Sequence, residues 1–382
     1  MLAYLDHAAS TPMCAEALDC MTDVLANVYG NPSGHHAEAR RARDILEQAR
    51  EEVAAWTGFE PGEIVFTSGG TEADNLAVLG AAASRPGPVV CSAVEHPAVL
   101  RASEHLGARI VPVAPNGVVD LDALASLLDP SVGLVSLMAA NNEVGVVQPL
   151  AEAVSLVREL APGAVVHTDA VHAAPWLDLA ELSRDVDLVS LSAHKFQGPK
   201  GAGILAIRGS VEGIVPRGFG GSQERDLRPG TQDVAAIAGM AAALRATASR
   251  RASEAARVGA LRDRLADGLR AALEGVVETG EGESGRSHKV PGSCHLCIEG
   301  VEAQELLVLL DQMGVAASVG SSCASGATQP SHVLAAMGVP PGLARGAVRF
   351  SLGHGSRSEE VDHALDVVPE AVGRLRGKRR SS

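Results

Sequence analysis

The chain has 382 residues and a formal charge of −14, and aromatic residues make up only 2% of it. That charge would repel a phosphate backbone and so few rings cannot form a base-stacking surface, so nucleic acid is excluded as the expected ligand. The length allows about two or three domains, which leaves ample volume for a buried core.

Six cysteines at irregular spacing do not indicate a disulfide framework. The longest apolar run, residues 234–244, is too short to span a bilayer, and the first residues do not resemble a targeting signal. We therefore expect a cytoplasmic protein without a membrane segment. The basic run at residues 374–380 is assigned no function.

The first part of the chain alternates between helical and strand-like patterns. Residues 37–56 carry apolar side chains at helical spacing among charges, which predicts an amphipathic helix. Apolar strands separated by helices predict an α/β fold with a mostly parallel, seven-stranded sheet. The seven predicted strands are residues 63–67, 88–94, 108–114, 133–140, 164–168, 187–192 and 203–207.

After about residue 230 the pattern changes to long helices rich in Ala, Leu and Arg, interrupted by a polar, Gly-rich stretch at residues 279–293. Short strands and helices follow. This change predicts a smaller C-terminal α+β domain joined to the first domain by a long helix.

Polar side chains follow five of the predicted strands. In open α/β sheets ligands bind beyond the carboxyl ends of the strands, so these side chains are expected to converge on one crevice. They are the stretch SGGTEADN (68–75), the pair Glu95 and His96, the run Asn141 to Glu143, Asp169, and the pair His194 and Lys195.

Lys195 ends an apolar strand, where a positive charge costs free energy unless the amine has a partner, is exposed or is kept neutral. Asp169 ends a neighbouring apolar strand, and SGGTEADN (68–75) is a Gly-rich turn entering a helix, which favours an anion such as phosphate. Pyridoxal 5'-phosphate is one ligand that would give a partner to the lysine, the carboxylate and the Gly-rich turn. Its Schiff base forms on the lysine, its pyridinium nitrogen pairs with the carboxylate, and its phosphate binds at the turn.

Simpler roles for these residues are also open. Thr71 is compatible with an ordinary helix cap, and Asp169 with a hydrogen-bonded loop residue. His167, Asp169 and His172 are close in sequence and are possible metal ligands, but they do not make a complete ligand set, so no metal is expected. The CHLC stretch (294–297) lacks a second cysteine pair and predicts buried cysteines.

Eleven motifs in order, from residue 4 to residue 354, resemble the cysteine desulfurases of the NifS and IscS type, which belong to the class-V aminotransferases of fold type I. The resemblance covers nearly the whole chain. The motifs are YLDHAAST, GNPS, EIVFTSGGTEADNLAV, VEHPAVL, NNEVGVVQP, HTDAVHA, SAHKFQGPKG, GGSQERDLRPGT, SVGSSCASG, QPSHVLAAMG and VRFSLGH.

The resemblance implies a large cofactor-binding domain at residues 15–250, and a small domain formed by residues 1–14 and 251–382 that carries the catalytic cysteine loop. It implies three catalytic residues: Lys195, which holds the cofactor, Cys323, which accepts the sulfur, and His96, which stacks on the ring and assists proton transfer. The residues that it implies for cofactor binding are Gly70, Thr71, His96, Asn142, Asp169, His172, Ser192, His194, Lys195 and, from the neighbouring subunit of a homodimer, Thr231.

For the substrate, the resemblance implies that Arg349 binds the carboxylate of L-cysteine, with Asn31 a weaker candidate and Asn142 nearby. One departure from the family pattern concerns His172, since the family usually has Gln at this position. A histidine adds a titratable group beside the cofactor's phenolic oxygen, so the absorbance and pH profile of the bound cofactor are expected to be unusual.

The implied reaction converts L-cysteine to L-alanine and leaves the sulfur as a persulfide on Cys323, for transfer to an acceptor protein. Alternatives on the same fold are a selenocysteine lyase, a related elimination enzyme, and a sulfur donor that needs a partner for activity. A pyridoxal-binding protein without catalysis is disfavoured, because the lysine, the aspartate and the thiol are all present. The sequence does not identify the acceptor, which leaves iron–sulfur cluster assembly, tRNA thiolation and other sulfur pathways open.

Overall fold

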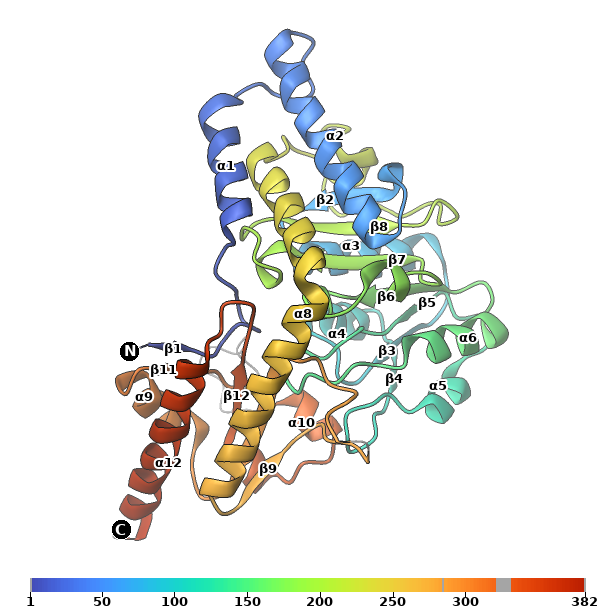
Figure 1. Cartoon of the computed structure of the whole chain (residues 1–382). Helices are drawn as coiled ribbons and strands as arrows, with labels where there is room; N and C mark the ends of the chain where they lie inside the picture. Colours follow the sequence, from blue (N-terminus) through green and yellow to red (C-terminus); the bar gives the residue numbers. More distant parts are fainter. Residues whose placement is uncertain (1, 284, 321–330, 381–382) are drawn as a thin grey trace.

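The computed structural model describes residues 2–283, 285–320 and 331–380. Its centre is a seven-stranded sheet in the order β2-β8-β7-β6-β5-β3-β4, in which β8 runs in the opposite direction to the other six strands (Figure 1). The predicted α/β fold with a mostly parallel sheet is therefore confirmed. The strands are β2 (Ile64–Thr67), β3 (Val89–Ser92), β4 (Arg109–Val111), β5 (Leu134–Ser136), β6 (Val165–Asp169), β7 (Leu188–Ser192) and β8 (Gly203–Ile207).

The strands read as continuous apolar runs because helices bury both faces of the sheet. In β2, Ile64 and Phe66 face one core while Val65 faces the other, as the two-residue period of a strand requires. One face is covered by α3 (Gly70–Ser84) and α4 (Pro97–His105). The helices that pack on the other face include α2 (Ala37–Thr57), α6 (Leu150–Leu160), α7 (Leu179–Leu182) and the first half of α8 (Val234–Ala272).

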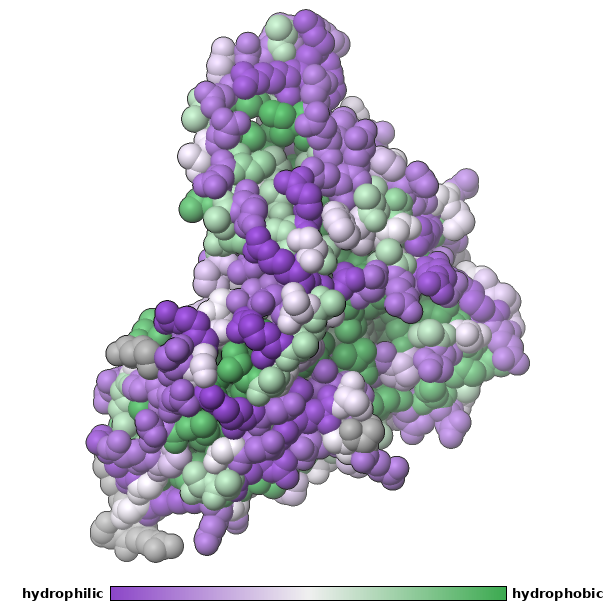
Figure 2. All heavy atoms as spheres, in the orientation of Figure 1, coloured by the Kyte–Doolittle hydropathy of each residue, from purple (hydrophilic) through white to green (hydrophobic). Residues whose placement is uncertain are grey.

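The remaining helices on this side are α1 (Ala15–Asn27), which packs against α8, and α5 (Leu121–Leu127), which packs against α6. In the orientation of Figure 1, Figure 2 shows hydrophilic residues over most of the visible face and apolar residues gathered between α1 and α2. Within the described part of the chain, no helix is both long and apolar enough to cross a membrane.

Two smaller sheets lie at the other end of α8. One pairs β1 with β11, and the other has the order β12-β10-β9. The elements of this part are β1 (Ala3–Tyr4), β9 (Val276–Glu278), β10 (Ser293–Ile298), α9 (Ala303–Gln312), β11 (Val315–Ala316), α10 (His332–Ala336), α11 (Pro341–Ala344), β12 (Ala347–Ser351) and α12 (Ser358–Arg380).

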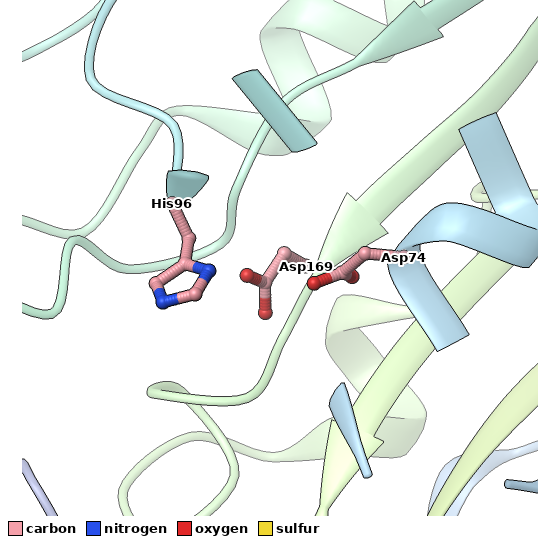
Figure 3. Close-up of side chains that lie close together, drawn as sticks. All are labelled: Asp74, His96 and Asp169. Carbon is pink, nitrogen blue, oxygen red and sulfur yellow. The ribbon is translucent and has the colours of Figure 1, made fainter. Parts of the chain in front are cut away.

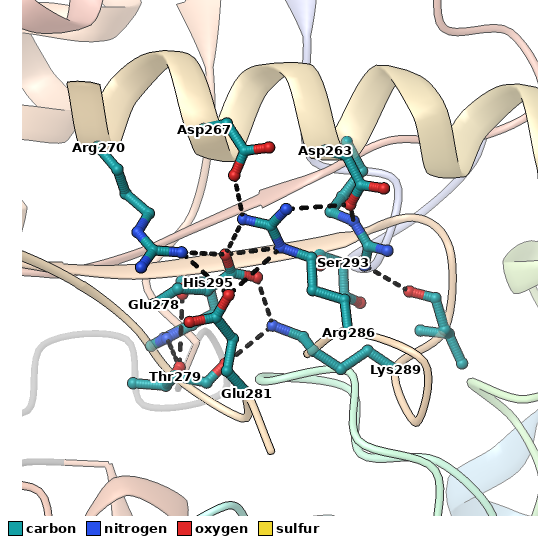
Figure 4. Close-up of polar contacts among 12 residues, drawn as sticks. Asp263, Asp267, Arg270, Glu278, Thr279, Glu281, Arg286, Lys289, Ser293 and His295 are labelled. Carbon is teal, nitrogen blue, oxygen red and sulfur yellow. Dashed lines mark hydrogen bonds and ion pairs between the residues drawn. The ribbon is translucent and has the colours of Figure 1, made fainter. Parts of the chain in front are cut away.

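The helix α8 spans 39 residues and packs against α1 and α2 at one end and against β9, β10 and α12 at the other. The polar stretch predicted as a break after this helix is held to it by ion pairs (Figure 4). Glu278 is the centre of this cluster, because its carboxylate accepts from Arg286 at 2.7 Å and from Lys289 at 2.9 Å. Arg286 also reaches Asp267 of α8 at 2.7 Å, so the stretch is attached to the helix.

Candidate active site

A cavity of about 630 Å³ opens at the carboxyl ends of the parallel strands and is closed on one side by β12. This position is the one expected for a ligand in an open α/β sheet. The cavity brings together ten of the residues predicted from sequence. They are Gly70, Thr71, His96, Asn142, Asp169, His172, Ser192, His194, Lys195 and Arg349.

Lys195 lies in a short 3-10 turn, Ala193–Lys195, that directly follows β7. Its ammonium group donates to the backbone oxygen of Ala9 at 3.0 Å and also to that of Ala8. These two residues belong to the YLDHAAST motif, so a segment from the other end of the chain meets the lysine. The amine thus ends a buried strand and is nevertheless hydrogen-bonded and open to the cavity.

The Gly-rich turn forms the N-terminus of α3, and its cap is Gly69, which makes no side-chain cap hydrogen bond. The alternative in which Thr71 caps the helix is therefore wrong, and the first N–H groups of α3 are available for an anion. Gly69 has φ of +146°, a region that favours glycine. A Cβ on Gly70 would lie 2.9 Å from Val171 Cγ2, so the backbone approaches its neighbours closely here.

Asp169 ends β6, is almost completely buried, and accepts a hydrogen bond from the backbone N–H of Val171 at 2.9 Å. Burial raises its pKa, while His96 and Lys195 lower it by favouring the charged carboxylate. Figure 3 shows Asp169 between His96 and a second carboxyl, that of Asp74 of α3. A ligand atom of each of the three lies within 4.8 Å of the others.

The histidines considered as metal ligands do not gather around Asp169. His167 is fully buried, and its two ring nitrogens lie 2.8 Å from Ser136 Oγ and 3.0 Å from Ser190 Oγ. His172 is turned toward Ser293 Oγ at 3.3 Å. The set of His167, Asp169 and His172 therefore does not form.

Arg349 of β12 is 1% exposed and borders the cavity. It donates to Asp6 Oδ1 at 3.0 Å and to the backbone oxygen of Asn142 at 2.9 Å. These contacts fix the guanidinium plane, and Asp6 balances its charge. A fixed, planar guanidinium is suited to bidentate binding of a carboxylate.

The two adjacent asparagines have different positions. Asn141 is fully buried, donates to the backbone oxygen of Val94, and accepts from the N–H groups of Glu143 and Val144. Asn142 lines the cavity. Only the second is therefore placed to contact a ligand.

His172 is buried, and burial lowers its pKa to about 3, with Lys195 and Arg349 acting in the same direction. The ring is therefore neutral at neutral pH. His194 is also neutral, since burial and the lysines beside it lower its pKa to about 4. Both rings can hydrogen-bond to a cofactor without adding positive charge to the site.

Glu143 is a cavity residue that the sequence places among the polar groups at the strand ends but to which it assigns no role. Its Oε2 accepts from Ser331 Oγ at 2.8 Å, and its side chain lies against Gly320. Burial raises its pKa to about 7. The signal that points to it is its place after a predicted strand, in the run that contains both asparagines.

Two predicted residues lie elsewhere, and a third is not described. Thr231 and Asn31 are exposed and do not line this cavity, and Asn31 Oδ1 accepts from the N–H of Ser33 at 2.9 Å. Cys323 lies outside the described residues.

The remaining cysteines fit the predicted packing role. Cys14, Cys91, Cys294 and Cys297 are buried, and Cys20 is half-buried. Burial raises the pKa of Cys91, Cys294 and Cys297 to about 12 each. Such thiols stay protonated and are poor nucleophiles.

Comparison with known proteins points to one family. The profile of the aminotransferase class-V family matches residues 3–364. An IscS-like cysteine desulfurase from Mycobacterium tuberculosis is 43% identical to this chain, over 98% of the chain and 97% of the relative.

Solved structures agree with this result. A NifS-like protein is 34% identical and superposes with a TM-score of 0.90, covering 98% of this chain and 100% of the other. A structure described as SspA in complex with cysteine is 28% identical, has a TM-score of 0.80, and covers 93% and 100% of the two chains.

Proposed function

This chain belongs to the aminotransferase class-V family and, within it, to the pyridoxal-phosphate-dependent cysteine desulfurases, and we propose that Lys195, Asp169 and Cys323 carry its reaction. The observation that carries the proposal is the convergence of three features on one cavity. Lys195 and Asp169 lie there at neighbouring strand ends, together with the uncapped N-terminus of α3.

The residues present fit pyridoxal phosphate. The N–H groups at Gly70 and Thr71 would hold the phosphate together with Ser192 and His194. Lys195 would form the Schiff base. Asp169, with its carboxylate held by Val171 and favoured by His96 and Lys195, would face the ring nitrogen. His96 would stack on the ring, and Asn142 and the neutral His172 would lie near the ring oxygen.

When bound, the pyridoxal ring supplies an electron sink for bonds at the carbon atoms of the substrate. Arg349 orients L-cysteine by its carboxylate. The Lys195 amine and His96 move the proton at the α-carbon. The Cys323 thiolate then takes the substrate sulfur: an S–S bond forms, the carbon–sulfur bond breaks, and a proton returned to that carbon gives alanine.

Elimination among the thiols supports the role of Cys323. Three of the other cysteines are buried with strongly raised pKa values, and burial also raises the pKa of the buried Cys14 and the half-buried Cys20. Only a thiolate is an effective nucleophile for sulfur. The persulfide then passes to an acceptor protein in the cytoplasm.

We further propose that the enzyme is a homodimer in which Thr231 of one subunit completes the phosphate site of the other. The exposed position of Thr231 and several exposed apolar side chains support this. These side chains are Leu18, Leu25, Tyr29 and Phe219. The division into a large domain (15–250) and a small one (1–14 and 251–382) is part of the same proposal.

The test is the production of alanine and sulfide from L-cysteine, with reductant and pyridoxal phosphate, by the wild type, Lys195→Ala and Cys323→Ser. Equimolar products from the wild type and from neither variant would support the proposal. Sulfide production that survives Cys323→Ser would contradict the thiol mechanism and favour an elimination or lyase reaction. A wild type that binds the cofactor without turnover would indicate dependence on a partner.

A further inference from the structure

Behind Asp169 lies a second carboxyl group, that of Asp74, for which the proposed function has no role. Asp74 is 1% exposed, and an oxygen of its carboxyl lies within 4.8 Å of one of Asp169. Figure 3 shows it on the side of Asp169 away from His96. It belongs to α3, the helix whose N-terminus is the proposed phosphate site.

Asp74 has no charged basic partner among the described residues. Within that part of the chain, the one basic group within 4 Å of its carboxyl is His167 Nε2, at 3.7 Å. Burial lowers the pKa of that histidine to about 3, so its ring is neutral. Asp74 Oδ1 is buried without a hydrogen-bond partner. Ser190 of β7 lowers the pKa of Asp74, whereas burial and the acidic groups of Asp169 and Glu95 raise it.

Asp169 has a different environment from Asp74. It receives the backbone N–H of Val171 and lies close to His96 and Lys195, which favour its charged form. Two enclosed carboxyl groups at this distance cannot both be ionised without large repulsion, so the pair holds one proton. Burial raises the pKa of both carboxyl groups, but that of Asp74 rises further, because His96 and Lys195 counteract the effect of burial at Asp169. The proton is therefore expected on Asp74.

We propose that Asp74 is a positioning residue that holds the proton of this pair, so that Asp169 is the single negative charge facing the cofactor's ring nitrogen. The inference rests on the proposed function in one respect, the pairing of Asp169 with that nitrogen. Asp74 then acts as a neutral carboxylic acid, and its proton removes the repulsion that would otherwise favour a neutral Asp169.

The test makes the same substitution, Asp to Asn, separately at each member of the pair. Asp74→Asn and Asp169→Asn each replace a carboxyl with a neutral amide of the same shape. If Asp74 is already neutral, Asp74→Asn should keep the dissociation constant of pyridoxal phosphate within about threefold of the wild type and leave the absorbance spectrum unchanged. Asp169→Asn should raise the dissociation constant at least about tenfold, because it removes one partner of a buried charge pair.

Infrared spectroscopy provides a readout that does not depend on the cofactor. Compared with Asp74→Asn, the wild type at neutral pH should show one additional C=O stretching band of a protonated carboxylic acid, and Asp169→Asn should show it too. Glu95 and Glu143, whose pKa values burial also raises, contribute to all three spectra alike. If Asp74→Asn fails to fold, the band that remains in the double variant Glu95→Gln, Glu143→Gln still decides the question.

Two results would overturn the inference: absence of the band, or an Asp74→Asn variant that weakens cofactor binding as much as Asp169→Asn does. Unchanged cofactor binding in Asp169→Asn would instead contradict the proposed role of Asp169, while the infrared band would still report the proton on Asp74. Failure of the two proposals can therefore be distinguished.

Discussion

His172 stands where the family usually has glutamine, and the structure changes what this departure is expected to do. The sequence predicts a titratable group that alters the pH profile of the cofactor, but burial lowers the pKa of His172 to about 3. We therefore predict that His172→Gln leaves the absorbance of the bound cofactor unchanged between about pH 5 and 9, because a neutral imidazole and an amide are both uncharged hydrogen-bonding groups. A spectrophotometric titration of both proteins checks this. A step near pH 6.5 in the wild type alone would contradict it.

Glu143 gives a second prediction at this scale. Its folded-state pKa is raised from 4.5 to about 7, so its contribution to stability is present below about pH 4.5 and is lost as the pH rises through 7. Relative to Glu143→Gln, the wild type should lose a few kcal/mol of unfolding free energy between pH 5 and pH 8. Urea denaturation of both proteins at the two pH values measures the difference, and parallel changes in both would contradict the prediction.

The sequence predicts Lys195 and Asp169 from physical argument, because a charge at the end of a buried strand needs a reason. It expects Glu143 and the stretch that contains Asp74 at the crevice, but it assigns neither residue a role. In the sequence Asp74 is simply a polar residue of a predicted helix. Only the packing of α3 on β6 and β7 shows that its side chain is buried beside a second carboxyl group. The raised pKa values of Asp74 and Glu143 come from desolvation, which depends on tertiary contacts that cannot be predicted from a single sequence.

At the scale of elements, the seven strands of the large sheet are predictable within a few residues, because apolar runs bounded by turns are typical of buried strands.

The segment before α8 is not predictable in the same way. It contains three consecutive residues with positive φ: Glu224 (42°), Arg225 (60°) and Asp226 (59°). Such a conformation is costly for residues with a Cβ, and the sequence of this segment does not predict it.

The side chain of Glu224 offsets that cost. Its carboxylate accepts two hydrogen bonds from Arg50 of α2, at 2.9 and 2.8 Å, and a third from the N–H of Phe66 at 2.9 Å, in a buried position. This anchor fixes the loop seven residues before Thr231.

We predict that Glu224→Gln lowers the unfolding free energy by about 3–5 kcal/mol, because it leaves the Arg50 guanidinium without its buried partner. Thermal and urea denaturation measure this loss. Glu283→Gln, a substitution at an acidic residue outside this anchor, is the control and should change stability little. A loss below about 1 kcal/mol at Glu224 would show that the pair is not an anchor.

At the scale of the whole molecule, the proposed exchange of Thr231 between subunits can be tested with two inactive variants. Lys195→Ala lacks the Schiff-base lysine, and Thr231→Asp would place a carboxylate beside the phosphate. In a mixed dimer, one of the two sites receives a normal Lys195 from one subunit and a normal Thr231 from the other. With random mixing half of the dimers are mixed, so about a quarter of all sites should be complete.

The expected result is therefore that the two variants, unfolded and refolded together, recover sulfide production to about a quarter of the wild-type value, whereas each refolded alone does not. No recovery, with dimers confirmed by sedimentation, would show that Thr231 serves its own chain, and a Thr231→Asp variant that is active alone would show that Thr231 serves no site.

The helix α8 has a consequence for the geometry of catalysis. A helix of 39 residues is about 58 Å long, and this one is in contact with elements packed around both the large sheet and the small ones. One end of the helix contacts elements packed around the large sheet, which carries Lys195 and Asp169, and the other end contacts elements around the small sheets, one of which carries Arg349. The proposed roles assign the cofactor to Lys195 and the substrate carboxylate to Arg349, in the two parts that this helix joins. A substrate longer or shorter than L-cysteine would therefore have to bind without a change in the spacing between these two groups.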